Sequence, residues 1–289
     1  MQLLNQKLIF VSGKGGVGKT SVSKAIALSR ARQQKRTLWI EFENPTHPNS
    51  DIEAISPYLS HLNCDATRAF EEYITLKIGL SAITKIFVQN KLISYLAKAG
   101  PGIHELVLLG KVWHLRGDYD HIVVDMPATG HGLAMFQSID NWSKLFNSGP
   151  LHRDAENMLE TFHSPEWTRH LIVALPEEMP LRESLDLSGF LLRLFPKNPA
   201  AFLVNRLFPR VSETATNLPG TPDNWPTPVA ASEMDYAVKR SVLESYNMRI
   251  WRDLGIQSLE LDFIAPPPRD SFSFIVEKLA DQIGNKGFL

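Results

Sequence analysis

Cysteine is almost absent from this sequence, which has a single one, Cys64, among 289 residues. One cysteine cannot form an internal disulfide, nor can it build a Cys-x-x-Cys metal site within one chain. We therefore expect no structural zinc site, since such a site would need cysteine pairs. The low cysteine content also favours a reducing, cytoplasmic location.

Charge of one sign and long apolar runs are lacking as well. The formal net charge is −1, with 30 Lys and Arg against 31 Asp and Glu, which argues against a nucleic-acid partner held by bulk electrostatics. No stretch approaches the ~18 apolar residues of a membrane span, and the first residues do not resemble a signal peptide. With 44% hydrophobic and 21% charged residues, we expect a soluble globular protein.

Short apolar runs separated by helical patterns predict the strands of one sheet. Several runs are apolar without interruption, such as LIFV, HIVVD and AFLVN, which is typical of strands covered on both faces. This predicts an α/β fold with a mostly parallel central sheet and helices on both faces. The predicted strands are Leu8–Ser12, Thr37–Phe42, His121–Asp125, Leu171–Leu175, Ala201–Asn205 and Leu259–Phe263.

The other stretches are predicted to be mainly helical and to belong to one domain, 1–289. The first helix is expected from about Lys19 to Gln33, and apolar stripes at helical spacing make Asp51–Gly117 mostly helical. Residues 52–117 and 133–165 would form a helical elaboration of the domain. The segment Leu207–Pro228 has five prolines and is predicted to be a long loop. Helices from about Ser232 to Leu254 and from about Asp270 to Ile283 complete the prediction.

A glycine-rich stretch, VSGKGGVGKTS, follows the first predicted strand. Within it Gly13–Thr20 matches G-x-x-x-x-G-K-[ST], a loop whose glycines let successive backbone N–H groups point at a phosphate. The start of the next helix adds its dipole. Lys19 is expected to reach the β- and γ-phosphates of ATP, and the Thr20 hydroxyl to bind Mg²⁺. The candidate nucleotide-binding residues here are Gly13, Gly15, Gly16, Val17, Gly18, Lys19, Thr20 and Ser21.

A second lysine, Lys14, stands near the start of this loop. GKGGVGKTS resembles the deviant Walker A loop, in which an additional lysine is the signature of a dimeric ATPase class. The resemblance implies that Lys14 crosses a two-fold interface and contacts the nucleotide of the partner subunit, much as an arginine finger does. It therefore implies a homodimer. The alternative is an ordinary solvated lysine at the edge of a loop.

The stretch YDHIVVDMPATGHGLAMF supplies a second motif, in which an apolar strand ends in Asp125 and is followed by PATGH. A carboxylate at the end of a central strand can hold Mg²⁺ through water. With PATGH attached, the stretch resembles the second switch of the ArsA / guided-entry ATPases, a P-loop NTPase family of arsenite-pump ATPases and ATPases that target tail-anchored proteins. The resemblance is to a bacterial-type, single-domain member. His131 lies in this switch, and the other eight histidines, which lack metal-binding spacing, are interpreted as ordinary polar residues.

The resemblance extends over most of the chain, because PGIHELVLLGKV and LPEEMPLRESLDL are similar to the family's helix before the second switch and to its Pro-Glu-Glu-Met segment. It implies that Asn205, at the end of LVN, reads the adenine base with its amide, which can donate and accept hydrogen bonds. It also implies that Pro266, in DFIAPPPRD, covers the other side of the adenine.

The first switch departs from the family pattern Asp-Pro-x-His. The sequence has EFENPTHPNSD at 41–51, so Asn44 stands where an aspartate would position the attacking water. An amide orients water but cannot take its proton. Glu41 or Glu43 could substitute, or the alignment could shift by one; in a strand both would point the same way. Asp51 matches a later switch aspartate and is a candidate magnesium residue.

Together these features predict an ATP-binding, Mg²⁺-dependent ATPase that forms a nucleotide-gated two-fold dimer and switches a helical region. The predicted catalytic residues are Lys14, Lys19, Asn44 and Asp125, and the predicted magnesium residues are Thr20, Asp51 and Asp125. The alternative is a regulatory or scaffold nucleotide-binding subunit in which Asn44 makes hydrolysis very slow. A partitioning ATPase would need a basic face, and a small-molecule kinase would not need Lys14.

A protein client or a membrane-associated partner is a further expectation from the resemblance. The relevant stretches, Ala66–Ala97 and Leu133–Phe162, are apolar but not rich in methionine, so they either form a binding groove or pack internally. With one cysteine the dimer needs an interface without zinc, and the soft ligands of a metalloid site are missing.

Overall fold

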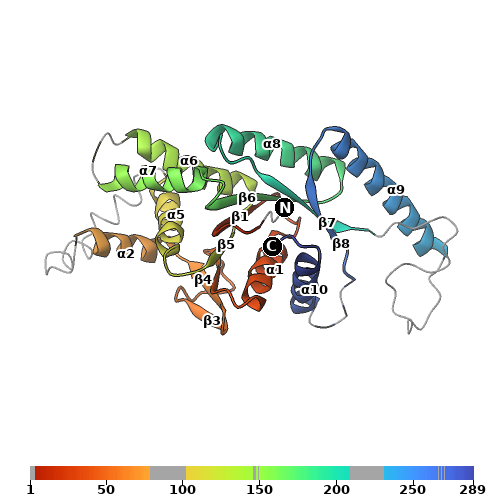
Figure 1. Cartoon of the computed structure of the whole chain (residues 1–289), viewed down its shortest axis with the longest axis horizontal. Coiled ribbons are helices and arrows are strands. Elements are labelled where there is room, and N and C mark those ends of the chain that lie inside the picture. Colours follow the sequence, from red (N-terminus) through yellow and green to blue (C-terminus); the bar gives the residue numbers. More distant parts are fainter. Residues whose placement is uncertain are drawn as a thin grey trace.

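The computed structural model describes residues 4–78, 102–145, 148, 150–208, 231–265, 267, 269 and 271–289. The strands of these residues form one sheet of eight, in the order β3-β4-β2-β5-β1-β6-β7-β8 (Figure 1). Every neighbouring pair is parallel except β3 and β4 at one edge. The predicted α/β fold with a mostly parallel sheet is confirmed. The strands are β1 (Leu8–Ser12), β2 (Thr37–Phe42), β3 (Glu53–Ser56), β4 (Leu59–Cys64), β5 (His121–Asp125), β6 (Thr168–Ala174), β7 (Ala201–Leu207) and β8 (Ser258–Asp262).

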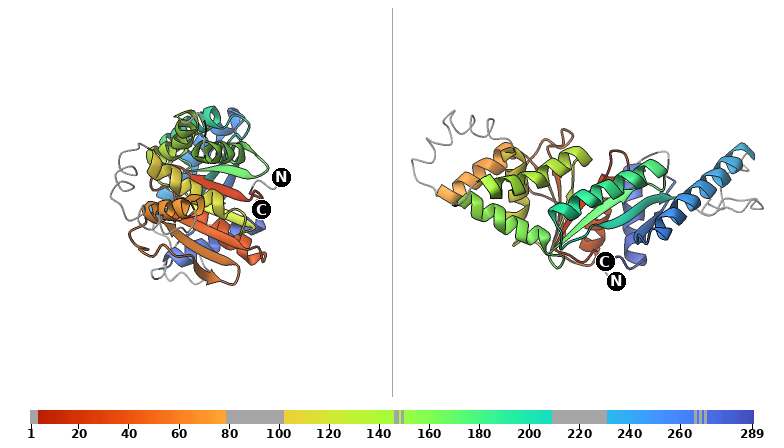
Figure 2. Two further views of the ribbon diagram at one scale, coloured as in Figure 1. Left: turned by 90° about the vertical axis from the view of Figure 1, so that its left-hand side faces the viewer. Right: turned by 90° about the horizontal axis from the view of Figure 1, so that it is seen from above.

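Helices cover both faces of the sheet (Figures 1 and 2). Helices α1 and α10 pack against each other on one face, while α5 to α8 lie on the opposite face. The described helices are α1 (Lys19–Arg32), α2 (Ala66–Ile78), α5 (Ile103–Leu115), α6 (Thr129–Leu145), α7 (Pro150–His163), α8 (Glu178–Leu194), α9 (Ala231–Asp253) and α10 (Ser271–Asn285). None of the helices in the described part of the chain is long and apolar enough to cross a membrane.

The apolar runs of the central strands supply the core on both faces. In β1, Leu8 and Phe10 pack with the α5–α8 side, and Ile9 and Val11 pack with α1 and α10. This division follows from the strand geometry, because successive side chains point to opposite faces. Since β1 is fully buried, the loop that leaves its carboxyl end starts from a rigid position in the middle of the sheet.

The strands β3 and β4 correct one expectation. The stretch from Asp51 to Gly117 was predicted to be mostly helical, yet residues 53–64 form two edge strands. In β4 the residues on the α1 face include His61 and Asn63, which are buried and polar. These two residues interrupt the apolar pattern that would identify a strand, and β3 is an exposed edge strand with no apolar run. The helical prediction holds for α2 and α5; residues 79–101 lie outside the described residues.

Candidate nucleotide and switch site

The loop between β1 and α1 depends on glycine at two positions. Gly13 has a φ of 147°, and a Cβ placed there would lie 2.4 Å from the carbonyl oxygen of Val173. Gly18 has a φ of 92°, and its Cβ would lie 2.5 Å from Nδ2 of Asn205. Any side chain would therefore collide with the backbone of β6 or with a buried amide, so the loop backbone is held close to both strands. The whole predicted set from Gly13 to Ser21 lies in this loop and the first turn of α1.

The amino end of α1 is free to receive an anion. Gly18 caps it without a side-chain hydrogen bond, and its first turn has no acidic residue. The Lys19 ammonium folds back over the loop and donates to the carbonyl oxygen of Lys14 at 3.0 Å. Burial lowers the pKa of Lys19, while the nearby charge of Asp125 acts in the opposite direction. A helix amino end without a side-chain cap, together with a half-buried ammonium, suits a phosphate group.

Asp125 and Thr20 meet directly beneath this loop. The Thr20 hydroxyl donates to Oδ2 of Asp125 at 2.6 Å, because Asp125 ends β5 opposite Val11 of β1. The other oxygen, Oδ1, is buried with no hydrogen-bond partner. Burial raises the pKa of Asp125 to about 6, although the Thr20 hydrogen bond and Lys19 oppose that shift. A desolvated, unpaired carboxylate oxygen beside a hydroxyl fits a hard cation such as Mg²⁺.

The raised pKa of Asp125 gives a stability prediction. In the folded protein this carboxyl keeps its proton up to a pKa of about 6, against an ordinary value of 3.8. The free energy of unfolding therefore falls as the pH rises from about 4 to about 6, and stays lower above that range. Since asparagine has no charge to desolvate, Asp125→Asn should be more stable than the native chain by roughly 1–3 kcal/mol at about pH 7.5, with little difference near pH 4.

Urea unfolding in a chelating buffer at the two pH values measures this difference. Asp120 is the matched control, because its exposed carboxylate accepts a hydrogen bond from the backbone of Arg36 and its pKa is lowered. Asp120→Asn should therefore destabilise the protein at the higher pH. Equal unfolding free energies for Asp125→Asn and the native chain at about pH 7.5 would contradict the raised pKa of Asp125.

Lys14 forms an ion pair within its own chain. Its Nζ lies 2.5 Å from Oε1 of Glu183 on α8, and its side chain is 50% exposed. The second carboxylate oxygen of Glu183, Oε2, is buried without a partner. An exposed pair of this kind is worth at most about 1 kcal/mol, so it holds the lysine only weakly. The partnership between Lys14 and Glu183 was not predicted from the sequence.

Asn205 lies behind the phosphate loop. It is buried, its Nδ2 donates to the carbonyl oxygen of Val17 at 3.0 Å, and its Oδ1 accepts from the backbone N–H of Arg206. Its amide therefore ties the end of β7 to the loop, and its predicted contact with adenine stays a prediction. Pro266, the other predicted adenine contact, lies outside the described residues.

In the first switch, Asn44 is held in a local turn. Its Oδ1 accepts from the backbone N–H and the hydroxyl of Thr46, and its Nδ2 donates to Oε2 of Glu41 at 2.8 Å. Asn63 of β4 anchors the same turn by accepting from the Asn44 N–H and donating to its carbonyl. The amide of Asn44 thus serves the structure of the loop. Asp51 is exposed and pairs with Arg68.

The expectation that Glu41 and Glu43 point the same way is wrong. The strand β2 ends at Phe42, and Glu43 has a φ of 48°, which breaks the alternation. Glu41 is buried on the α1 face, whereas Glu43 is exposed and lies 3.0 Å from His104 of α5. The charge of Glu41 contributes to the raised pKa of Asp125, after burial of that carboxyl as the main cause.

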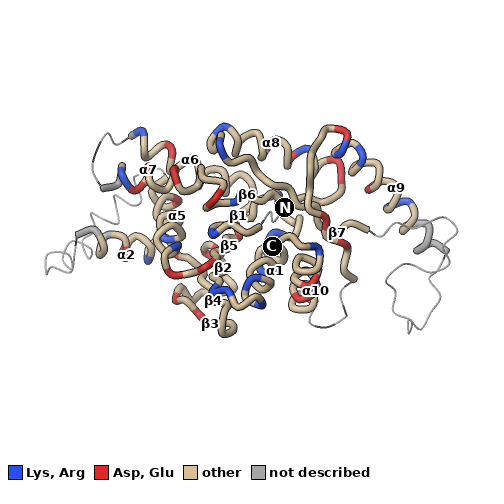
Figure 3. Tube along the Cα trace, viewed as in Figure 1, with Lys and Arg blue, Asp and Glu red and all other residues tan. Residues whose placement is uncertain are grey.

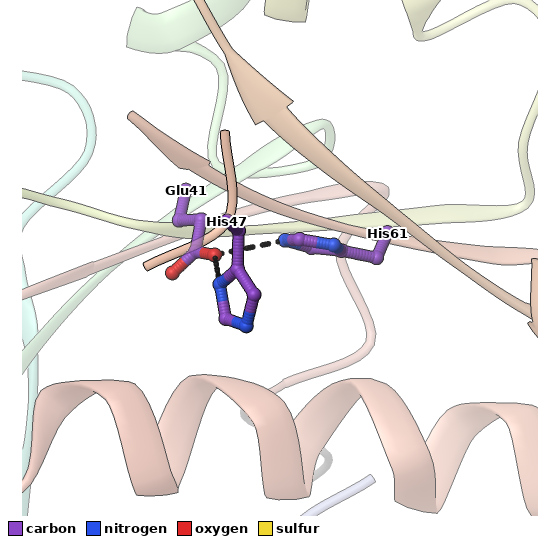
Figure 4. Close-up of side chains that lie close together, drawn as sticks. All are labelled: Glu41, His47 and His61. Carbon is purple, nitrogen blue, oxygen red and sulfur yellow. Dashed lines mark hydrogen bonds and ion pairs between the residues drawn. The ribbon is translucent and has the colours of Figure 1, made fainter. Parts of the chain in front are cut away.

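Two histidines converge on Glu41, and this cluster was missed from the sequence. Nδ1 of His47 lies 2.5 Å and Nε2 of His61 3.0 Å from the same oxygen, Oε1 (Figure 4). Burial opposes the Glu41 charge, but the hydrogen bonds from His61, Asn44 and His47 outweigh it, so the pKa of Glu41 is lowered. No pattern in the sequence indicated that His47 and His61 would share one carboxylate oxygen. Only the pairing of β2 with β4 brings His61 to the cluster.

The glycine-rich loop between a central parallel strand and a helix, with Thr20 on Asp125, defines a P-loop nucleotide-binding protein. The family described as anion-transporting ATPase (ArsA) matches residues 6–153, and the chain belongs to this family. Family membership places it among the ATP-binding ATPases at that general level.

Relatives with curated names agree with this assignment. The chain is 27% identical over 207 residues to ATPase BagA of Mycobacterium tuberculosis (64% of this chain, 61% of that protein). It is 27% identical over 265 residues to an arsenical pump-driving ATPase of Escherichia coli (76% and 45%). It is 29% identical over 150 residues to a putative arsenical pump-driving ATPase 2 of Aquifex aeolicus (47% and 50%). In each case the match spans less than two thirds of the relative's own length.

Proposed function

We propose that this chain is a Mg²⁺-dependent ATPase that works as a two-fold dimer gated by nucleotide. The observation that carries the proposal is the convergence of three groups below the loop. Thr20 donates to Asp125, the second Asp125 oxygen is buried and unpaired, and Lys19 is half-buried beside them. Thr20 and Asp125 would hold Mg²⁺, which neutralises phosphate charge when bound. Lys19 and the α1 amides would bind the triphosphate.

The direct test is steady-state phosphate release from the purified chain with ATP, with Mg²⁺ present or replaced by a chelator. The proposal expects hydrolysis that requires Mg²⁺ and that saturates with ATP. Phosphate release independent of Mg²⁺, or equal to that of a protein-free control, would overturn it.

Asp51 is a poor candidate for holding the Mg²⁺ ion, because its side chain is exposed and pairs with Arg68.

Dimerisation through Lys14 requires that the lysine leave Glu183. The pair is weak, and a partner's triphosphate carries more charge than one carboxylate, so we infer that nucleotide would draw Lys14 across the interface. Exposed apolar side chains lie on α8, which carries Glu183, and on the neighbouring α9; they include Leu185, Leu192, Tyr246 and Ile250. This surface would supply an interface that needs no zinc.

Figure 3 shows that basic and acidic residues are interspersed along the described elements, which supports a partner other than nucleic acid.

A protein client remains part of the proposal. An apolar hollow of about 290 Å³ lies between α2, α5 and α7, on the side of the sheet away from α1. Its lining includes Leu76, Leu106, Val107, Trp113 and Met158. A hollow of this composition suits an apolar side chain of a client, and cross-linking to a photoreactive group placed at Leu76 would test it.

The second candidate is a regulatory subunit that binds ATP and hydrolyses it very slowly. The hydrogen bonding of Asn44 favours it, because the amide is engaged by Glu41 and Thr46 and cannot act as a base. If the regulator hypothesis is correct, Asn44→Asp should raise single-turnover hydrolysis about 100-fold. If the native chain is a working ATPase, Asn44→Asp should change the rate less than about tenfold.

The design of this test follows from the contact of Asn44 with Glu41. A carboxylate at position 44 would face the Glu41 carboxylate across the present 2.8 Å hydrogen bond, and two like charges repel at that distance. The variant Asn44→Asp should therefore also be measured together with Glu41→Gln, whose amide can donate to Asp. If the native chain hydrolyses ATP at an ordinary ATPase rate in a single turnover, the hypothesis of a slow regulatory subunit is excluded.

A further inference from the structure

We propose that Glu41, His47 and His61 form a binding site for a divalent transition-metal ion such as Zn²⁺. One carboxylate oxygen and two ring nitrogens lie within 4.8 Å of one another, and they form the one such cluster found among the described residues. Figure 4 shows both imidazole rings directed at the Glu41 carboxylate. The cluster shares no residue with the Mg²⁺ and nucleotide site proposed above, and its test needs no nucleotide.

The distances suit a small ion after a slight opening of the cluster. Ligand atoms about a tetrahedral Zn²⁺ with bonds of about 2.0–2.1 Å are about 3.4 Å apart, against the present 2.5 and 3.0 Å from Oε1 to the two nitrogens. His47 is on an exposed loop and its side chain is 50% exposed, so a shift of this ring by less than 1 Å, roughly, supplies the room. Two imidazoles and one carboxylate select Zn²⁺ over Mg²⁺, which prefers oxygen ligands.

The surroundings fix two of the three ligands in place. His61 is buried and stacks on Trp39 with ring centres 4.7 Å apart, and the Trp39 indole N–H donates to Ser23 of α1. Glu41 is buried in β2, and its second oxygen accepts a hydrogen bond from Asn44. Partners of this kind orient metal ligands and are characteristic of real sites. A bound ion would join β2, β4 and the loop between them, and so hold the first-switch segment that carries Asn44.

Metal titration of the full-length protein at neutral pH tests the proposal, with Co²⁺ absorption as a report of coordination geometry and Zn²⁺ competition for affinity. The native chain should bind one ion per chain, with the visible absorption of a tetrahedral site. His47→Ala should weaken binding by at least about 100-fold, and the exposure of His47 makes this variant safe for folding. His61→Asn is the second ligand variant.

The matched control is His104→Ala, because His104 is also a half-exposed histidine paired with a glutamate, Glu43, at 3.0 Å. It should leave the metal affinity unchanged. The proposal is overturned if the native chain binds no stoichiometric ion, if His47→Ala binds as tightly, or if His104→Ala loses as much affinity.

Discussion

Replacing Lys14 by alanine is expected to lower ATP hydrolysis by roughly 10²- to 10³-fold, while ATP affinity of the separate subunit changes only a few-fold. The reason lies in the different places of the two lysines. Lys19 is half-buried toward Asp125, whereas Lys14 is exposed and turned to Glu183 on the outside of the loop. A cation placed there reaches its own phosphates poorly, but it is available to a second subunit.

The measurement is the mass of the protein in solution with and without a non-hydrolysable ATP analogue, together with the hydrolysis rate. The native chain should become a dimer with the analogue, and Lys14→Ala should stay a monomer. Glu183→Gln keeps the lysine but removes its partner within the chain. It should dimerise at an equal or up to about fivefold lower protein concentration, since the exposed pair it breaks is worth at most about 1 kcal/mol.

A surface lysine remote from the loop gives the matched control. Lys35 follows α1 and is exposed, so Lys35→Ala removes the same charge without touching the loop. It should behave like the native chain in both assays. A Lys14→Ala variant that dimerises and hydrolyses ATP like Lys35→Ala would show that the lysine has no role in the partner's site.

The central strands and the phosphate loop could be predicted because their signals are local. Short apolar runs identified β1, β2 and β5 at their observed bounds, and the glycine pattern required only neighbours in sequence. Thr20 and Asp125 were both predicted as magnesium residues, and they contact each other because α1 begins at the carboxyl edge of the sheet where β5 ends. The local patterns identify the strand and the loop, and the parallel sheet brings the ends of its strands, with the motifs that follow them, close together.

The rest of the site depends on strand order and on single backbone angles. His61 reaches Glu41 only because β4 pairs with β2, and β4 was not recognised because its buried residues His61 and Asn63 are polar. The left-handed φ of Glu43 separates it from Glu41, which strand periodicity cannot reveal. The pairing of Lys14 with Glu183 joins residues 169 positions apart, and no local pattern connects them.

Replacing Lys19 by alanine should have the largest effect of all, a loss of hydrolysis of at least roughly 10³-fold. The charge of the Lys19 ammonium counteracts the raised pKa of Asp125, one oxygen of which is buried without a hydrogen-bond partner. Removing it should take away the proposed phosphate contact and raise the pKa of Asp125 further. The variant should therefore bind ATP at least about tenfold more weakly, as a lost charge-assisted hydrogen bond implies.

The activity of Lys19→Arg separates two explanations for the loss of hydrolysis in Lys19→Ala. If Lys19 acts only as a charge beside Asp125, arginine should restore most of the activity, because it keeps the charge. If the lysine must enter the curved loop as a compact donor, arginine should fail, since its planar group fits another geometry. The present hydrogen bond from Nζ to the carbonyl oxygen of Lys14 places the ammonium inside the loop, so we expect arginine to fail. Full activity of Lys19→Ala would mean that this ammonium is not needed for hydrolysis, and the role proposed here for Lys19 would then be wrong.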